Sequence, residues 1–200
     1  MFRKLPALLA ATAFLLWLSA CVNLKPKASL SKSYTLGPIE AVAPGKAQSQ
    51  EHQLYILHPQ IPAYLDGPRL GYRLASGEVK NMEGARWAEP LAEGIARAMA
   101  LFMSESSLIR VVGHYPSPNT RPEASRLALN FQRFGATASG EIQVLVNWEL
   151  RPAEGEVRRG QFVSAGLTWV VGDSDSLVQA YNQALHGLTL ELAKAMALLD

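Results

Sequence analysis

Three segments in the second half of the chain alternate apolar and polar residues with a period of two. They cover 127–131, 141–150 and 163–171. Successive side chains of a strand point to opposite faces, so each segment would carry one apolar face and one wetter face. This alternation is typical of an antiparallel sheet that is buried on one side. The joins near 138–140 and 153–155 are short, as hairpins require.

Two segments with helical periodicity complete this pattern, at 86–104 and 174–199. Asp173 or Ser174 can cap the second helix, and Pro90 is tolerated in the first turn of the first. The apolar stripes are Leu91, Ile95, Ala98, Met99 and Phe102 in the first helix and Tyr181, Leu185, Leu188, Leu192, Ala195 and Leu199 in the second. Two amphipathic helices on one face of an antiparallel sheet predict an α+β domain.

Shorter strand candidates precede or separate these elements. They lie at 33–36, 53–58, 69–75, 78–81 and 108–114. The segment 59–68 carries three prolines and a glycine. Because proline fixes φ and lacks an N–H donor, this segment predicts an ordered loop rather than a strand or a helix.

The first twenty residues have the composition of a secretory signal. Arg3 and Lys4 precede an apolar run over 8–18, and Ser19-Ala20 precede Cys21. The run is shorter than the roughly 20 residues that span a bilayer, so a transmembrane anchor is the weaker interpretation. Cys21 is the only cysteine, which excludes an intramolecular disulfide. Its position favours lipidation over an incidental residue of the signal.

We therefore expect a signal peptide over 1–20, a lipidated tether over 21–33 and one domain over 34–200. The 22–33 segment is polar and rich in Lys and Ser, as tethers are. The whole chain has 19 basic and 17 acidic residues, and removal of Arg3 and Lys4 with the signal leaves 17 of each. A neutral mature chain argues against a nucleic-acid partner.

Residues that could carry catalysis are few. The histidines are His52, His58, His114 and His186, and none has metal-ligand spacing to another ligating residue. No G-x-S-x-G motif and no glycine-rich phosphate loop occurs, and the acidic residues are scattered. The sequence thus predicts a protein that is not an enzyme and needs neither a metal nor a cofactor.

Two segments stand out as a candidate patch, either structural or partner-binding. Its residues are Pro62, Tyr64, Leu65, Asp66, Pro68, Arg86 and Trp87. In the structural interpretation, Tyr64 and Trp87 fill the edge of the core, while Asp66 pairs with an arginine or caps a turn. In the functional interpretation the prolines stiffen a surface for a partner, since Trp, Tyr and Arg dominate binding hot spots. The residues alone favour the structural interpretation.

Four motifs in this order resemble the ABC-type transport auxiliary lipoprotein family. They are Leu18-Ser19-Ala20-Cys21, which is similar to a lipobox, then Tyr34-Thr35-Leu36, Ile61-Pro62-x-Tyr64-Leu65-Asp66-x-Pro68 and Arg86-Trp87-Ala88-Glu89-Pro90-Leu91. The resemblance extends over nearly all of 21–200. It implies that Cys21 receives a diacylglycerol and that its amino group is acylated, for example with palmitate.

The resemblance also implies a function without catalysis. Such lipoproteins accompany MCE-domain proteins, which carry lipids between the inner and outer membranes. The family places the lipoprotein on the periplasmic face of the outer membrane, where it docks the transporter. Val22 agrees with this location, because inner-membrane lipoproteins commonly carry Asp directly after the cysteine.

Two other functions remain open, as does the binding surface. One alternative is an envelope-assembly lipoprotein that binds another outer-membrane protein. The other is a lipid-tethered periplasmic hydrolase. A homo-oligomer is compatible with all three functions. If the candidate patch does not bind a partner, the exposed sheet face around Asn130, Gln143 and Asn147 is the next surface to consider.

Overall fold

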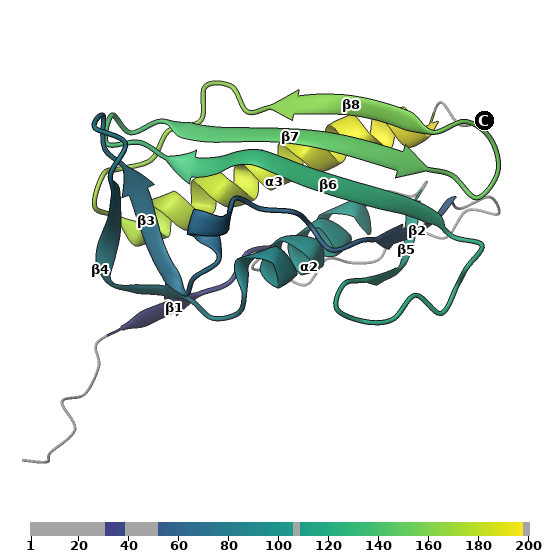
Figure 1. The fold of residues 1–200 in the computed structure, drawn as a ribbon, viewed down its shortest axis with the longest axis horizontal. Helices are drawn as coiled ribbons and strands as arrows, with labels where there is room; N and C mark the ends of the chain where they lie inside the picture. Colours follow the sequence, from purple (N-terminus) through teal and green to yellow (C-terminus); the bar gives the residue numbers. More distant parts are fainter. Residues whose placement is uncertain (1–30, 39–51, 106–108, 198–200) are drawn as a thin grey trace, which may run out of the picture. The chain divides into compact units, whose positions relative to one another are not determined.

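A five-stranded sheet forms the centre of the computed structural model, which describes residues 31–38, 52–105 and 109–197. In spatial order its strands are β5 (Ile109–His114), β2 (His52–Ile56), β6 (Ser125–Ala136), β7 (Ile142–Arg151) and β8 (Arg158–Val163) (Figure 1). The strands β6, β7 and β8 run antiparallel, as the alternation predicts. However, β2 lies parallel to both β5 and β6, so the sheet is mixed rather than purely antiparallel.

A second, three-stranded sheet has the order β1-β4-β3. Its strands are β1 (Lys32–Tyr34), β4 (Val79–Trp87) and β3 (Arg69–Arg73). The hairpin between β3 and β4 turns at Gly77, whose φ of +89° suits glycine. β1 adds to β4 in parallel. A single 3₁₀ turn, η2 (Ala63–Leu65), interrupts the loop before β3.

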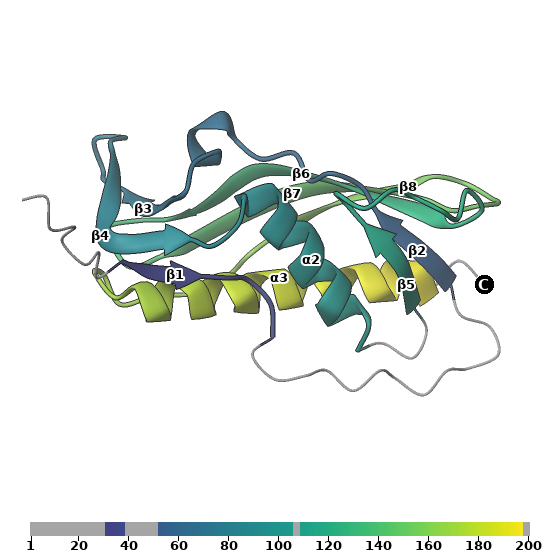
Figure 2. The same cartoon turned by 90° about the horizontal axis from the view of Figure 1, so that it is seen from below.

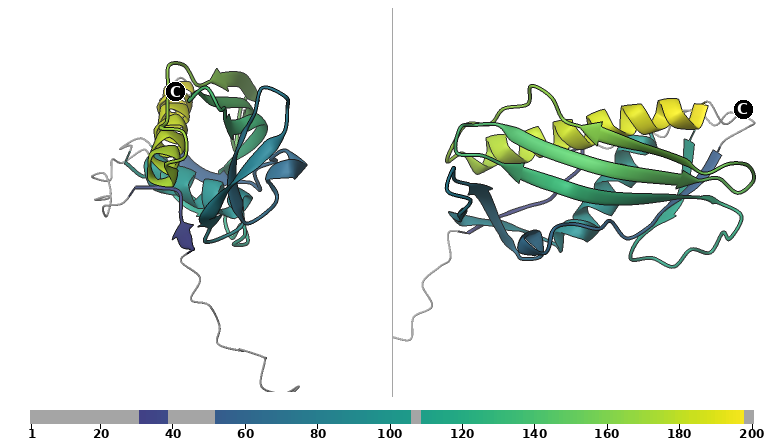
Figure 3. Two further views of the ribbon diagram at one scale, coloured as in Figure 1. Left: turned by 90° about the vertical axis from the view of Figure 1, so that its left-hand side faces the viewer. Right: turned by 45° about the horizontal axis from the view of Figure 1, so that its top comes forward.

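Two helices, α2 (Leu91–Met103) and α3 (Ser174–Ala197), lie on the same side of the long strands (Figure 2). The end-on view in Figure 3 shows no α-helix on the opposite side of these strands. Asp173 caps α3, since its Oδ1 accepts the N–H of Asp175 at 2.9 Å. The α+β class predicted from the sequence is therefore confirmed.

The predicted stripe of α2 is buried in the core, as are Tyr181, Leu185, Leu188 and Leu192 of α3. Ala195 is half-buried against the core, and Leu199 lies outside the described residues. Tyr181 of α3 stacks on Phe134 of β6 with ring centroids 4.5 Å apart. Burial raises the pKa of Tyr181. Trp148 and Trp169 are 8% and 5% exposed, so both lie in the core as their alternating strands predict.

The third alternating segment is displaced from its predicted position. The strand is 158–163, whereas 164–171 lies outside it and contributes one isolated bridge, from Thr168 to Glu141. Gly166 has φ of +69°, a conformation that ends a regular strand. Trp169 is nevertheless buried: its ring packs against that of Tyr72 with centroids 5.2 Å apart, and its Nε1 donates to the carbonyl oxygen of Thr137 at 3.1 Å.

The first helix begins later than its periodicity predicts. Arg86 and Trp87 end β4, where they pair with Ser33 and Tyr34. The residue before a proline disfavours helical geometry, and Pro90 itself has an extended ψ of 132°. Helical geometry therefore starts at Leu91, and the return strand expected at 78–81 continues to 87.

Several predictions from the N-terminal sequence fall outside the described residues. The signal peptide over 1–20, Cys21 and most of the tether over 21–33 are among them. Within the described ranges, no helix is long and apolar enough to cross a membrane.

Candidate functional site

The loop before β3 is built around η2. The N–H of Leu65 donates to the carbonyl oxygen of Pro62 at 2.9 Å, and the N–H of Asp66 donates to that of Ala63 at 3.1 Å. Leu65 packs partly buried against the core, whereas Tyr64 is 51% exposed and Asp66 is exposed. The loop thus has one side chain that anchors it and two that face solvent.

The structure brings this loop against the end of β4. The N–H of Trp87 donates to the carbonyl oxygen of Pro68 at 2.7 Å. The two segments line a cleft of about 320 Å³, whose walls are Asp66, Gly67, Pro68, Trp87, Ala88, Glu89 and Pro90. The segments 62–68 and 86–90 therefore form one continuous patch. We call these residues the proline-loop patch.

The members of the proline-loop patch have different environments. Trp87 is 8% exposed, and its ring lies 6.2 Å from that of Tyr181. Arg86 is exposed, and its Nε donates to Ser33 Oγ at 3.0 Å, which ties β4 to β1. Trp87, Leu65 and Arg86 thus have visible structural roles. Asp66 is exposed, and its described contacts include no pairing with an arginine. Tyr64 is half-exposed: it lines a small hollow between β3 and β6, where a Cβ at Gly135 would lie 4.0 Å from its hydroxyl.

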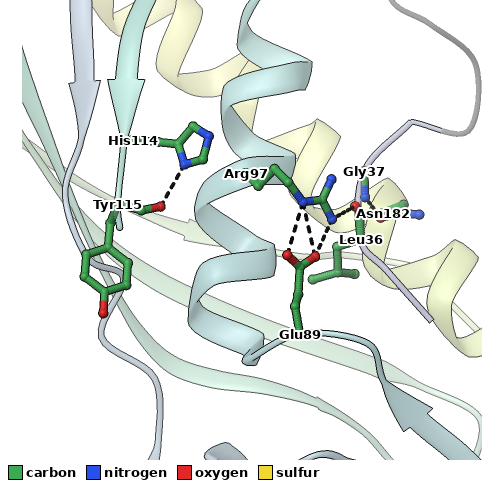
Figure 4. A network of polar contacts seen from close by, with 7 residues as sticks. All are labelled: Leu36, Gly37, Glu89, Arg97, His114, Tyr115 and Asn182. Atoms are coloured by element: carbon green, nitrogen blue, oxygen red, sulfur yellow. Dashed lines mark hydrogen bonds and ion pairs between the residues drawn. The ribbon is translucent and has the colours of Figure 1, made fainter. Parts of the chain in front are cut away.

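Glu89, at the rim of the cleft, forms an ion pair with Arg97 of α2 (Figure 4). The Nε of Arg97 donates to both carboxylate oxygens of Glu89, at 3.2 and 3.3 Å. The Nη2 of Arg97 donates to the carbonyl oxygen of Leu36 at 2.8 Å. Because the pair is about two-thirds buried, its hydrogen bonds gain strength from the shielded environment. Arg97 therefore joins the cleft to the segment that follows β1.

A second contact holds the same segment to α3. The N–H of Gly37 donates to Asn182 Oδ1 at 2.8 Å. Gly37 has φ of +113°, and a Cβ there would meet Arg97 and Leu101 at 3.5 Å. The sequence marked Glu89 only as part of the Arg86–Leu91 motif, and it did not mark Arg97 or Asn182. Glu89 precedes α2 and Arg97 lies within it, so no helical spacing in the sequence marks them as a pair.

His58, His114 and His186 each contact a neighbouring residue. The ring of His58 packs edge-on against Tyr115, and His114 Nδ1 lies 2.7 Å from the carbonyl oxygen of Tyr115. His186 lies 3.6 Å from a carboxylate oxygen of Glu105. Over the described ranges, no three His, Cys, Asp or Glu side chains are grouped so that they could hold a metal ion.

Comparison with known proteins identifies a family and a fold. The family model described as "ABC-type transport auxiliary lipoprotein component" matches residues 34–193. Among curated proteins, no match is found.

Two crystal structures share the fold. One, described as an uncharacterized protein, is 17% identical with a TM-score of 0.65, and the match covers 83% of this chain and 99% of that one. The other is a Xanthomonas campestris protein of the DUF330 family, 21% identical with a TM-score of 0.55, and the match covers 82% of this chain and 90% of that one. Both identities are low, so these similarities establish the fold alone.

Proposed function

The chain belongs to the ABC-type transport auxiliary lipoprotein family, and on this premise we propose that it docks an MCE-domain protein of an intermembrane lipid transport system at the outer membrane. In this proposal it performs no catalysis and needs no cofactor. Its lipidated Cys21 holds it to the periplasmic face of that membrane. Binding the transporter is its contribution to transport.

One observation carries the docking proposal. Tyr64, which is 51% exposed, lies on a loop whose adjoining residues are held by contacts with the rest of the domain. Leu65 packs on the core, and the carbonyl of Pro68 is hydrogen-bonded to Trp87. A rigid loop loses little conformational entropy when it binds, so more of the contact energy appears as affinity. A half-exposed tyrosine on a fixed loop is the kind of anchor that dominates interfaces.

The docking test uses two variants and two measurements. Tyr64→Ala removes an exposed ring, so we expect an unchanged melting temperature and loss of crosslinked capture of the MCE-domain protein. Arg86→Ala removes a contact that ties β1 to β4. We expect it to lower the melting temperature and to reduce capture only as folded protein is lost. Normal stability with normal capture in both variants would refute the docking role of the patch.

Anchoring is tested separately. We expect Cys21→Ser to abolish processing and membrane attachment, because the thiol that receives the lipid is lost. Membrane fractionation and the size of the mature protein measure this directly. A Cys21→Ser protein that is processed normally and still sediments with the outer membrane would show that lipidation is not the anchor. The native protein should follow outer-membrane markers in a density gradient, and co-migration with inner-membrane markers would exclude the proposed location.

The remaining functions differ in what capture recovers. An envelope-assembly lipoprotein would capture another outer-membrane protein and no MCE-domain protein. A tethered hydrolase would turn over ester or glycosidic substrates without any partner. Capture followed by identification of the partner therefore separates docking from both.

A further inference from the structure

A groove of about 650 Å³ crosses the five-stranded sheet on the face opposite α2 and α3. We call it the outer groove. Its polar walls are the exposed His58, Gln60, Asn130, Asn147, Gln161 and Arg159 and the half-buried Glu149. They come from β6, β7 and β8 and from residues 57–60, which continue β2 along the edge of β6. The N–H of Gln60 donates to the carbonyl oxygen of Leu129 at 2.9 Å, which fixes this wall.

Four amide side chains form a row across the groove. Gln60 is bridged to Asn130, Asn130 pairs with Asn147, and Asn147 pairs with Gln161. Neighbouring strands lie about 4.8 Å apart, so the amides recur at that interval. Gln161 Nε2 donates to Asn147 Oδ1 at 2.9 Å, which orients both groups. Asn130 Oδ1 likewise accepts from Gln132 Nε2 at 2.8 Å, so each asparagine oxygen keeps one lone pair for a ligand. Each amide thus still offers donors and an acceptor, the pair that a peptide unit offers.

Beside the amide row lies a carboxylate with two arginines. Glu149 Oε2 accepts from Arg159 Nε at 2.8 Å, and Glu149 Oε1 accepts from Arg151 Nη2 at 2.9 Å. The two guanidiniums hold the pKa of Glu149 below its usual value. One positive charge remains uncompensated in this trio, and 66% of the Arg159 side chain is exposed. The groove therefore complements a ligand that carries a carboxylate.

The lining disfavours an acyl chain. Leu129 and Trp148 also border the groove, but they are 1% and 8% exposed because their side chains belong to the helix side. The apolar side chains that reach the groove are Leu57, which is 37% exposed, and the small Ala128. An alkyl chain laid over the amide row would bury amide groups without hydrogen bonds, which is unfavourable.

We propose that the outer groove binds an extended peptide segment of a protein partner, with the amide row hydrogen-bonding its backbone and Arg159 binding one of its carboxylate side chains. The peptide is read mainly through its backbone, so its sequence is constrained chiefly by the acidic residue. The outer groove shares no residue with the proline-loop patch. The binding role of each site can therefore be tested independently of the other.

The test uses the lipidated chain, extracted in detergent, on an array of ten-residue peptides in matched pairs. In each pair, the Asp and Glu residues of one member are Asn and Gln in the other. We expect the acidic members to bind more strongly. For the strongest acidic member, fluorescence anisotropy should show affinity about tenfold weaker with Arg159→Gln, because one charge-assisted hydrogen bond is lost. Asn147→Leu should weaken acidic and amide members alike.

Matched controls distinguish the outer groove from general charge and amide effects. Arg121→Gln removes an exposed arginine elsewhere, and Gln183→Leu removes an exposed amide on α3. Both should bind like the native chain. Equal binding of acidic and amide members, or equal loss in Arg159→Gln and Arg121→Gln, would overturn the proposal. A third result would also overturn it: the native chain binds phosphatidylglycerol vesicles but no peptide, and Arg159→Gln abolishes the vesicle binding. The outer groove would then bind a lipid headgroup.

Discussion

The two faces of the strands β6, β7 and β8 are built from alternate residues of the same segments and have opposite characters. On the helix side, Leu129, Val146 and Trp148 are at most 8% exposed. One residue further along the chain, Asn130 and Asn147 lie on the outer face and are exposed. The same backbone ladder thus supports a core and a recognition surface. The difference shows that the period-two pattern encodes where the sheet packs and also where it is left open.

The helix side is packed closely enough to restrict its neighbours. The indole of Trp148 lies across Gly160 on the adjacent strand, and a Cβ at Gly160 would lie 2.3 Å from Trp148 Cζ2. Trp148 Nε1 donates to Glu191 of α3 at 3.1 Å, which fixes the ring. No comparable constraint is seen at the outer groove, where the polar side chains meet solvent.

The largest expected effect is therefore on the helix side. Trp148→Ala should lower the free energy of unfolding by about 3–5 kcal/mol, because it opens a cavity and leaves Glu191 without its indole donor. Chemical denaturation measures this loss. A variant as stable as the native chain would show that the core does not depend on this face of β7.

Gly160→Ala should come next. The added methyl group overlaps the Trp148 ring, and overpacking of this kind costs about 1–3 kcal/mol. The control is Gly67→Ala, where a Cβ would meet nothing within 4 Å and φ is not positive. Thermal melting of both should show a loss only for Gly160→Ala. Equal melting temperatures would mean that the indole can move off Gly160 without cost.

Asn147→Ala should have a much smaller effect, since exposed substitutions usually change stability by less than about 0.5 kcal/mol. Its side chain accepts one hydrogen bond, from Gln161. Denaturation of Asn147→Ala beside Trp148→Ala compares the two faces at adjacent positions. A loss as large as that of Trp148→Ala would remove the distinction between a packed face and a binding face.

The smallest expected effect lies away from both faces, at the start of α3. Asp175 accepts a hydrogen bond from Tyr34 at 2.8 Å and pairs with Lys32 at 3.1 Å. These partners lower the pKa of Asp175 below its ordinary 3.8. The contact stabilises the fold above about pH 4 and is lost as pH falls through the lowered pKa. The side chain is exposed, so the contribution is slight and is screened by salt.

Comparison of Asp175→Asn with the native chain at pH 7 and at pH 3 tests this assignment. The difference in melting temperature should be present at pH 7, be smaller at pH 3, which is below the ordinary pKa of 3.8, and shrink at high salt. A difference that persists unchanged at pH 3 would show that Asp175 acts through something other than its charge.

Periodicity was sufficient for the elements whose surroundings are simple. β6, β7 and α3 have one apolar face each, so their positions could be read from residues such as Val144, Val146 and Leu185. The position of β8 could not, because its inner face contains Gly160. That glycine contributes no apolar side chain to the alternating pattern. The reason for a glycine at this position is visible only in the structure, where the Trp148 ring covers it.

Strand pairing also exceeded what the sequence could provide. Leu54, Tyr55 and Ile56 are buried in succession, which is typical of a central strand, but no local pattern states that β2 runs parallel to both neighbours. The candidate site shows the same limit. Composition marked Tyr64 and Trp87, whereas the link from Arg97 to the carbonyl of Leu36 depends on a fold that joins distant segments.

The position of β1 has a mechanical consequence. Any pull on the chain from residues upstream of Ser31 reaches the domain first at β1, which has three paired positions with β4. Side-chain contacts such as Arg86 to Ser33 share that load. Further along the chain, Arg97 and Asn182 hydrogen-bond the main chain of Leu36 and Gly37, so a force that separates β1 from β4 next meets these two contacts. Under tension β1 should separate from β4 first, which lengthens the segment that precedes the domain while the five-stranded sheet and both helices stay folded.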